Sequence, residues 1–236
     1  MDCGFGVMSK KRVIVAIDGP AGAGKSTIAK RVAEKLGFVY INTGAMYRAI
    51  ALWALRLNVS LGDMHRLEQL AKEAKIELMD HGQVLLNGED ITEAIREQEV
   101  SNAASKVSAV AAVRRALVRM QREMAEKTSV VMEGRDIGSV VFPHATVKIF
   151  LDADPGERAR RRSFELKETG QTADIGSVTT ELHQRDARDR ERQESPLVQA
   201  PDAELVDTTG LSLEQVEDSV LRIVRARTSN GKEAAR

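Results

Sequence analysis

A glycine-rich segment near the N-terminus contains the residues best suited to phosphate chemistry. It has the sequence G-P-A-G-A-G-K-S-T over residues 19–27, so Gly19, Gly24, Lys25 and Ser26 match the pattern G-x-x-x-x-G-K-[ST]. Glycines let backbone N–H groups curve around a phosphate, and a helix that begins near Lys25 directs its positive dipole end at the same anion. Lys25 is suited to the β- and γ-phosphates, and the Ser26 hydroxyl to Mg²⁺.

This segment is the motif called the P-loop, and it predicts an ATP site. A glycine-rich turn without any ligand is the alternative. The presence of all the defining residues between an apolar strand and a helix argues against that alternative. The residues expected to bind ATP are Gly19, Pro20, Ala21, Gly22, Ala23, Gly24, Lys25, Ser26 and Thr27.

The segments that must position the P-loop are predicted from the spacing of apolar residues. Short apolar runs that indicate strands alternate with stretches of helical period. The strands are expected at residues 13–18, 38–41, 129–132, 147–151 and 203–207. Strands separated by helical stretches imply a parallel sheet with right-handed crossovers. The predicted class is therefore α/β, with a central five-stranded parallel sheet flanked by helices.

Polar residues come after the carboxyl ends of the first three predicted strands. They are Lys25, Ser26, Thr43, Arg48, Arg135 and Asp136. Because parallel strands end at one edge of a sheet, we expect these side chains to lie close together. Asn42 or Thr43 could instead act only as the N-cap of the next helix. Their position at a strand end favours a second ligand site beside the P-loop.

Residues 60–104 interrupt the alternation of strands and helices. After an amphipathic helix, residues 76–88 have the pattern strand, turn, strand, turn, which predicts an antiparallel hairpin. We expect a small inserted subdomain here, followed by one long helix over residues 104–127. Trp53, in the apolar helix that precedes the insertion, is expected in the core rather than on a ligand-stacking surface.

Residues 156–192 contain two clusters of arginine. The first comprises Arg158, Arg160, Arg161 and Arg162, and the second Arg185, Arg188, Arg190 and Arg192. Like charges at spacings of three and four on a helix repel, so the clusters cost stability unless an anion neutralises them. An arginine on a transferring phosphoryl group can accelerate the reaction by about 10³–10⁵. We predict a helical lid over the phosphates; the alternative is a solvent-facing helical hairpin whose ion pairs contribute little.

The composition excludes several other classes of protein. The 35 basic and 35 acidic residues balance to zero, and aromatic residues are 3% of the chain, which argues against a nucleic-acid binder. The one cysteine, Cys3, offers no disulfide framework, and no apolar run approaches the ~20 residues that a membrane span needs. We expect a monomer of the reducing cytoplasm. Its parts would be a disordered leader (1–10), a single domain (11–227) and a frayed tail (228–236).

Several motifs together resemble one family. The P-loop sequence is joined by N-T-G-A-M-Y-R-A at 42–49, E-G-R-D-I-G-S-V-V-F-P at 133–143, R-D-A-R-D-R at 185–190 and S-P-L at 195–197. With these motifs the chain resembles the nucleoside monophosphate kinases, and within them the bacterial cytidylate (CMP/dCMP) kinases, from Arg12 to about Arg227. The P-loop alone is unspecific. T-G-A-M-Y-R, the inserted hairpin and G-R-D-I-G are specific to the cytidylate branch.

The resemblance implies a P-loop kinase that phosphorylates CMP and dCMP to CDP and dCDP with ATP and Mg²⁺. It implies that residues 60–104 form the monophosphate-binding subdomain. The implied substrate-binding residues are Thr43, Arg48, Ser105, Arg114, Arg135, Asp136, Arg185 and Asp189. The implied catalytic residues are Lys25, Arg135, Arg158, Arg162, Arg185 and Arg192, and Ser26 is the implied Mg²⁺ ligand.

Within this set, Ser105, Arg114 and Asp136 are implied to contact the cytosine edge. An ionised Asp accepts from the exocyclic amine of cytosine while Arg and Ser donate to its acceptors, and uracil does not match that pattern. Two departures from common family members occur: Thr43 replaces a frequent Ser, and Glu133 stands where an Asp is frequent. Two other functions remain open, a P-loop kinase for uridylate or another metabolite, and a non-enzymatic nucleotide sensor.

Overall fold

The computed structural model describes residues 12–79, 82–168 and 174–233. Its centre is a five-stranded, all-parallel sheet in the order β2-β6-β1-β7-β8. The strands are β1 Ile14–Asp18, β2 Val39–Asn42, β6 Val130–Gly134, β7 Val147–Asp152 and β8 Glu204–Asp207. All five predicted strands are therefore confirmed. The second was expected to be buried, but β2 is an edge strand in which Val39 is 44% exposed.

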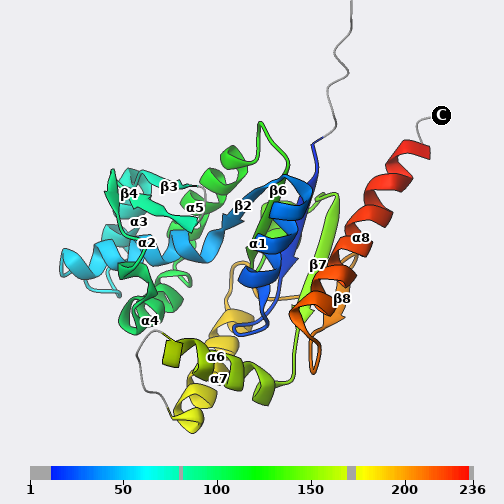
Figure 1. The fold of residues 1–236 in the computed structure, drawn as a ribbon. Coiled ribbons are helices and arrows are strands. Elements are labelled where there is room, and N and C mark those ends of the chain that lie inside the picture. The colour runs from blue at the N-terminus through cyan, green and yellow to red at the C-terminus, as the bar shows by residue number, and fades with distance from the viewer. Residues whose placement is uncertain (1–11, 80–81, 169–173, 234–236) are drawn as a thin grey trace, which may run out of the picture.

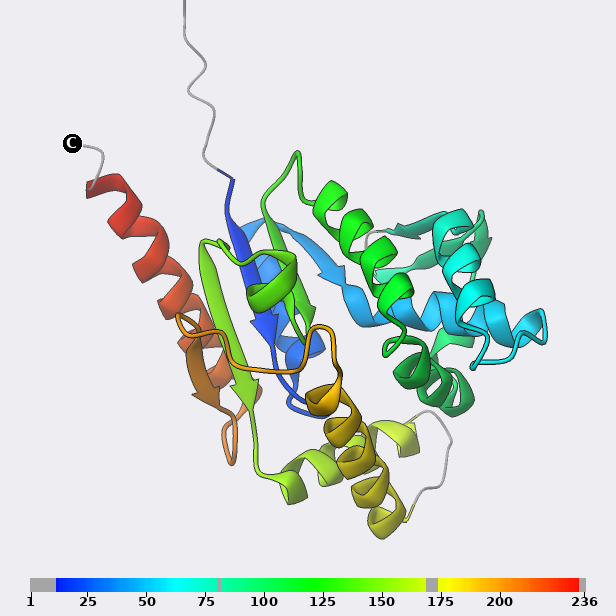
Figure 2. The ribbon, with the colours of Figure 1, turned by 180° about the vertical axis from the view of Figure 1, so that it is seen from behind.

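Helices cover both faces of this sheet (Figures 1 and 2). On one face lie α1 (Lys25–Leu36) and α8 (Leu213–Glu233), which pack in one core cluster with β1, β6 and β7. On the other face lie α5 (Ala111–Met124) and η3, one turn of π-helix over Ile137–Val141. The sequence predicts that the last helix ends near Arg227, and this is wrong, because α8 continues to Glu233. The predicted leader at 1–10 lies outside the described residues.

The predicted insertion at 60–104 packs with helices on either side of it into a second layer beside the sheet, and this layer has its own apolar core (Figure 1). Within or overlapping the insertion are α3 (Met64–Glu73), η2 (Ala94–Arg96) and α4 (Gln98–Val107), and α2 (Thr43–Arg56) and part of α5 complete the layer. The hairpin is confirmed as β3 (Ile76–Leu78) and β4 (Val84–Leu86), and a short third strand, β5 (Glu89–Asp90), extends it. Trp53 packs against this core as expected.

One long helix over residues 104–127 is not formed. The chain breaks into α4 and α5 at residues 108–110, where Val110 is extended (φ −79°, ψ 110°). The Ser108 hydroxyl donates to the Ser105 carbonyl (3.0 Å), which closes the end of α4. The break also leaves the Ser108 carbonyl available to accept a hydrogen bond from Nη1 of Arg114 (3.1 Å). The interruption therefore helps to orient a residue that was predicted to bind substrate.

The arginine-rich region forms the expected pair of helices, α6 (Pro155–Glu168) and α7 (Ile175–Glu191), which pack together below the carboxyl ends of the strands (Figure 2). The sequence predicts a polar loop as far as Thr180. Instead α7 begins at Ile175, because the Asp174 carboxylate accepts the Ser177 N–H (3.1 Å) as an N-cap. A small apolar cluster joins both helices to Ala21 of the P-loop.

Candidate active site

A cavity of about 230 Å³ lies where the P-loop, the inserted layer, the end of β6 and helices α6 and α7 meet. Most of the predicted site residues line it. They are Ala21, Gly22, Gly24, Lys25, Ser26, Thr27, Thr43, Arg48, Ser105, Arg114, Arg135, Asp136, Arg162, Arg185, Asp189 and Arg192. Four predicted residues do not line it: Gly19, Pro20, Ala23 and Arg158. The convergence of three strand ends is thus confirmed.

The P-loop has a conformation that its glycines permit. Gly19 (φ 149°) lies so close to β7 that a Cβ would stand 1.9 Å from the Leu151 carbonyl oxygen. Gly24 (φ 83°) precedes α1 without any side-chain cap, so the first N–H groups of the helix remain available to an anion. Nζ of Lys25 donates to the Pro20 carbonyl (2.6 Å), which holds the lysine against its own loop.

Lys25 is buried beside this loop, and its charge is unfavourable in the free protein. Burial, followed by the nearby charge of Arg135, lowers the pKa of Lys25 to about 7. A bound phosphate would supply the missing counter-charge. Lys25 is therefore poised to gain a full positive charge when an anion enters the loop.

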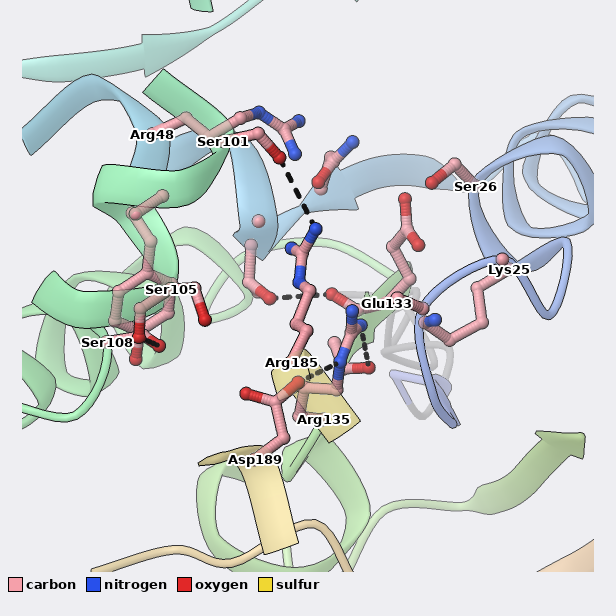
Figure 3. A pocket seen from close by; sticks show the side chains of 18 of the residues that line it. Lys25, Ser26, Arg48, Ser101, Ser105, Ser108, Glu133, Arg135, Arg185 and Asp189 are labelled. Carbon is pink, nitrogen blue, oxygen red and sulfur yellow. Dashed lines mark hydrogen bonds and ion pairs between the residues drawn. The ribbon is translucent and has the colours of Figure 1, made fainter. Parts of the chain in front are cut away.

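Glu133, near the end of β6, lies on the same side of the cavity as Lys25 and Ser26 (Figure 3). Its carboxylate accepts a hydrogen bond from the Tyr40 hydroxyl (2.6 Å), and its carbonyl accepts one from Oγ1 of Thr43 (2.7 Å). Burial and the Glu133 charge raise the pKa of Tyr40, so the phenol stays a donor. The neighbouring Ser26 hydroxyl counteracts this shift of the Tyr40 pKa. These contacts place a buried carboxylate and the Ser26 hydroxyl near one another.

A buried ion pair lies at the opposite end of the cavity. Nη2 of Arg114 on α5 pairs with the carboxylate of Asp136, and both side chains are almost fully buried. The Arg114 guanidinium also lies over the Tyr47 ring, with Cζ 5.5 Å from the ring centroid. The Ser105 hydroxyl is buried there and has no partner among the described residues. A planar ligand with donors and acceptors on one edge would meet complementary groups in this corner.

Between these two ends lies a group of arginines (Figure 3). Nε of Arg135 donates to Asp189 of α7 (2.9 Å), and Nη1 of Arg185 donates to the Ser101 hydroxyl (3.3 Å). Burial and the neighbouring arginines lower the pKa of Arg185 to about 10, and burial lowers that of Arg48. Such clustering of cations around a cavity is favourable only when an anion occupies it.

The lid arginines have different positions. Arg162 lines the cavity and its Nη2 donates to Oε1 of Gln98 (2.9 Å). Arg158, only 5% exposed, lies behind the P-loop: its Nη1 contacts Asp186 (2.5 Å) and the Ala21 carbonyl (3.1 Å). Its Nε donates to the Ala153 carbonyl (3.1 Å). The guanidinium of Arg158 is thus occupied by the protein itself, and it joins both lid helices to the loop.

The predicted site residues leave out several that line the cavity. Asn42 and Glu133 were noted in the sequence without a site role, and Tyr47, Ser101 and Ser108 were not considered. Tyr47 lies on α2 inside the motif T-G-A-M-Y-R, so the motif itself could have indicated it. Ser101 lies one turn before Ser105 on α4 and could have been found once α4 was recognised. Ser108 could not, because the break between α4 and α5 was not predicted.

The sequence matches a family of known proteins. The model of the family described as cytidylate kinase matches residues 15–226 of this chain. The chain belongs to the cytidylate kinase family. The cytidylate kinase of Solibacter usitatus is 61% identical over 226 residues, which is 95% of this chain and 97% of that protein. The cytidylate kinase of Geobacillus kaustophilus is 49% identical over 92% of this chain and 99% of that protein.

A solved structure supports the fold independently. A gluconokinase from Sinorhizobium meliloti superposes with a TM-score of 0.52 at 14% identity, covering 96% of this chain and all of that one. At this identity the likeness concerns the fold alone. No helix among the described residues is both long enough and apolar enough to cross a bilayer.

Proposed function

We propose that this chain transfers the γ-phosphoryl group of ATP to the phosphate of CMP or dCMP and forms CDP or dCDP. The observation that supports this most strongly is the composition of the cavity. One cavity contains a P-loop, a group of arginines and the Arg114–Asp136 pair. A donor phosphate chain, an acceptor phosphate and an acceptor base each have a matching set of groups.

The donor nucleotide would bind through the P-loop. The N–H groups at the start of α1 and the Lys25 ammonium both favour the triphosphate. The residues proposed to bind ATP are those of 19–27, although Gly19, Pro20 and Ala23 would act by shaping the loop. The close approach of Gly19 to β7 and the Lys25 contact with Pro20 are the contacts that suggest this role.

The phosphate of the acceptor would lie among Arg48, Arg135 and Arg185. Its charge would neutralise cations whose burial is otherwise costly, since burial lowers the pKa of Arg48 and that of Arg185. Asp189 and Thr43 orient this group: Asp189 accepts from Arg135, and Thr43 ties the start of α2 to β6. Asp189 would also contact the ribose.

The base would lie in the corner formed by Ser105, Arg114 and Asp136. Asp136 pairs with Arg114 through one carboxylate oxygen, and its carboxylate could accept from the exocyclic amine of cytosine. The Ser105 hydroxyl, unpartnered among the described residues, can donate to a cytosine acceptor. Uracil has a carbonyl in place of the amine, and two oxygens would then face each other.

Direct in-line transfer needs no covalent intermediate with the protein. The acceptor phosphate is the nucleophile, so catalysis consists of alignment and charge neutralisation. Lys25, Arg135, Arg162, Arg185 and Arg192 would stabilise the charge of the transition state. Arg158 was predicted in the same role, and we propose instead that it positions the lid, because its donors already bind Asp186, Ala21 and Ala153. A lid over the cavity would exclude water and so limit ATP hydrolysis.

The residues present fit Mg²⁺. The ion prefers oxygen ligands and usually keeps several waters, with one or two protein groups and the substrate phosphates. The Ser26 hydroxyl and the Glu133 carboxylate, both linked to Tyr40, offer such oxygens on the P-loop side of the cavity. Among the described residues, no cluster of three or more His, Cys, Asp or Glu side chains is arranged for a metal. When bound, Mg²⁺ would neutralise phosphate charge.

We also propose that the protein acts as a monomer in the cytoplasm. The balanced charge and the single cysteine of the sequence support this. Residues 11–227 would form one kinase domain, with a monophosphate-binding subdomain at 60–104 and a lid at 156–192. The separate three-stranded sheet β3-β4-β5 supports the subdomain, and the packing of α6 against α7 supports the lid.

A coupled assay of ADP release across the nucleoside monophosphates tests the proposed function. CMP and dCMP should support rapid turnover, while UMP, AMP and GMP should not. A reaction without acceptor measures ATP hydrolysis and is the control. If the purified protein binds ATP but forms no ADP with any monophosphate, it is a nucleotide sensor and the proposal fails.

A further inference from the structure

Asp18 is a buried carboxylate to which neither the ATP site nor the substrate site assigns a role. It is the last residue of β1 and only 5% exposed, and it does not line the cavity. Its Oδ1 accepts the Ile137 N–H (2.8 Å), and its Oδ2 accepts the Gly138 N–H (2.7 Å). The charge of Asp18 is thus directed at the backbone that follows Asp136.

These two N–H groups belong to the first turn of η3, whose N-cap is Asp136. The first N–H groups of any helix lack partners within the helix, and buried ones are costly when left unpaired. Asp136 itself makes no capping hydrogen bond with its side chain. Its carboxylate is instead free to pair with Arg114. Asp18 therefore takes over the cap and leaves Asp136 available to a ligand.

Asp18 also immediately precedes the P-loop, which begins at Gly19. Burial raises the pKa of Asp18 to about 6, although the two N–H groups and the Lys25 ammonium counteract this shift. The Asp136 charge adds to the increase. Burying a carboxylate in this position costs free energy, and the hydrogen bonds from its two backbone N–H partners offset that cost.

We propose that Asp18 is a positioning residue for the acceptor base: it fixes the backbone of Ile137 and Gly138 and thereby aims Asp136 at cytosine. This inference rests on the proposed function, since it concerns the same base site. It predicts that a change at Asp18, one residue from the P-loop, affects the acceptor nucleotide more than ATP.

The test compares Asp18→Asn with the wild-type protein. The amide has one acceptor oxygen, and its NH₂ group would oppose a backbone N–H. We expect kcat/KM for CMP to fall about tenfold to a hundredfold, as for a catalytic group displaced by a fraction of an ångström. The preference for CMP over UMP should fall with it, while the KM for ATP stays within about twofold. Equal loss for ATP and CMP, or unchanged CMP kinetics, would overturn the proposal.

Asp152→Asn is the matched control. Asp152 ends the neighbouring strand β7 and also accepts a backbone N–H, that of Ala153 (2.8 Å), but it does not touch η3. Its replacement should leave the CMP preference unchanged. A loss of CMP preference equal to that of Asp18→Asn would show that any damaged strand end produces the effect.

Gly138→Ala decides the question if Asp18→Asn does not fold. A Cβ there would lie 3.4 Å from Oδ2 of Asp18 and 3.2 Å from the Lys148 side chain, so it presses on the contact between Asp18 and η3 from the η3 side. Weaker CMP binding with unchanged ATP binding, measured by calorimetry, supports the proposal, and unchanged CMP binding overturns it. The wild-type turnover of CMP is measured in parallel, and its absence would refute the proposed function rather than the positioning role.

Discussion

The donor and acceptor sides of the cavity are built in different ways. The donor side is one continuous loop, residues 19–27, whose shape depends on its own glycines and on the start of α1. The acceptor side is assembled from residues far apart in sequence: Arg114 meets Asp136 across 22 positions, and Arg135 meets Asp189 across 54. Donor chemistry is therefore a local property of the chain, whereas acceptor choice is a property of the whole fold.

The largest expected effect tests the donor side. Lys25→Met should lower kcat by about 10³ with every acceptor, because it removes a preorganised charge from the transferring phosphates. Steady-state kinetics measures this, and Lys30→Met, on the exposed side of α1, is the control. A loss of CMP turnover with intact ATP hydrolysis would contradict the assignment of Lys25 to the donor side.

Asp136→Ala tests the acceptor side. We expect kcat/KM for CMP to fall by about 10²–10³, because the amine of cytosine loses the carboxylate that would accept its hydrogen bond. The KM for ATP should change little. The change also leaves Arg114 buried without its counter-ion, at a cost of about 3–5 kcal/mol. The double variant Arg114→Met, Asp136→Ala should regain stability but not CMP turnover. Unchanged CMP kinetics in Asp136→Ala would remove this residue from the site.

The two lid arginines allow a comparison within one helix. Arg158→Ala should lower the free energy of unfolding by about 3 kcal/mol, since Asp186 loses a buried partner, which corresponds to roughly 10 °C in Tm. Arg162→Ala should leave Tm unchanged and lower kcat by about tenfold to a hundredfold. Thermal denaturation and kinetics on both variants check this. The opposite pattern would return Arg158 to the catalytic set.

The smallest effect concerns the proton of Lys25. Its pKa of about 7 in the free protein means that the amine is mostly neutral at pH 8. Bound phosphates favour the ammonium and raise the pKa, so ATP binding at pH 8 should take up a proton, whereas at pH 6 Lys25 is already charged. Calorimetry in buffers of different ionisation enthalpy measures the uptake. Lys25→Met should abolish it, and uptake that persists in that variant would assign the proton elsewhere.

The same contrast explains how much the sequence could predict. The strands, the hairpin and the P-loop depend on local patterns, and they were found. The break at Ser108, the exposed edge at Val39 and the position of Arg158 depend on tertiary contacts, and they were not. Arg158 and Arg162 lie on one helix and cannot be told apart by spacing alone, since only the packing of α6 against Ala21 shows which guanidinium faces the cavity.

We propose that Arg114 and Asp136 select cytosine as the base of the acceptor nucleotide, while the P-loop binds the ATP that donates the phosphoryl group. The most direct measurement is the ratio of kcat/KM for CMP to that for UMP, determined for the wild-type protein and for Asp136→Ala. We expect a strong preference for CMP in the wild-type protein and its loss in the variant, with ATP binding unchanged in both. Equal turnover of CMP and UMP by the wild-type protein would contradict it.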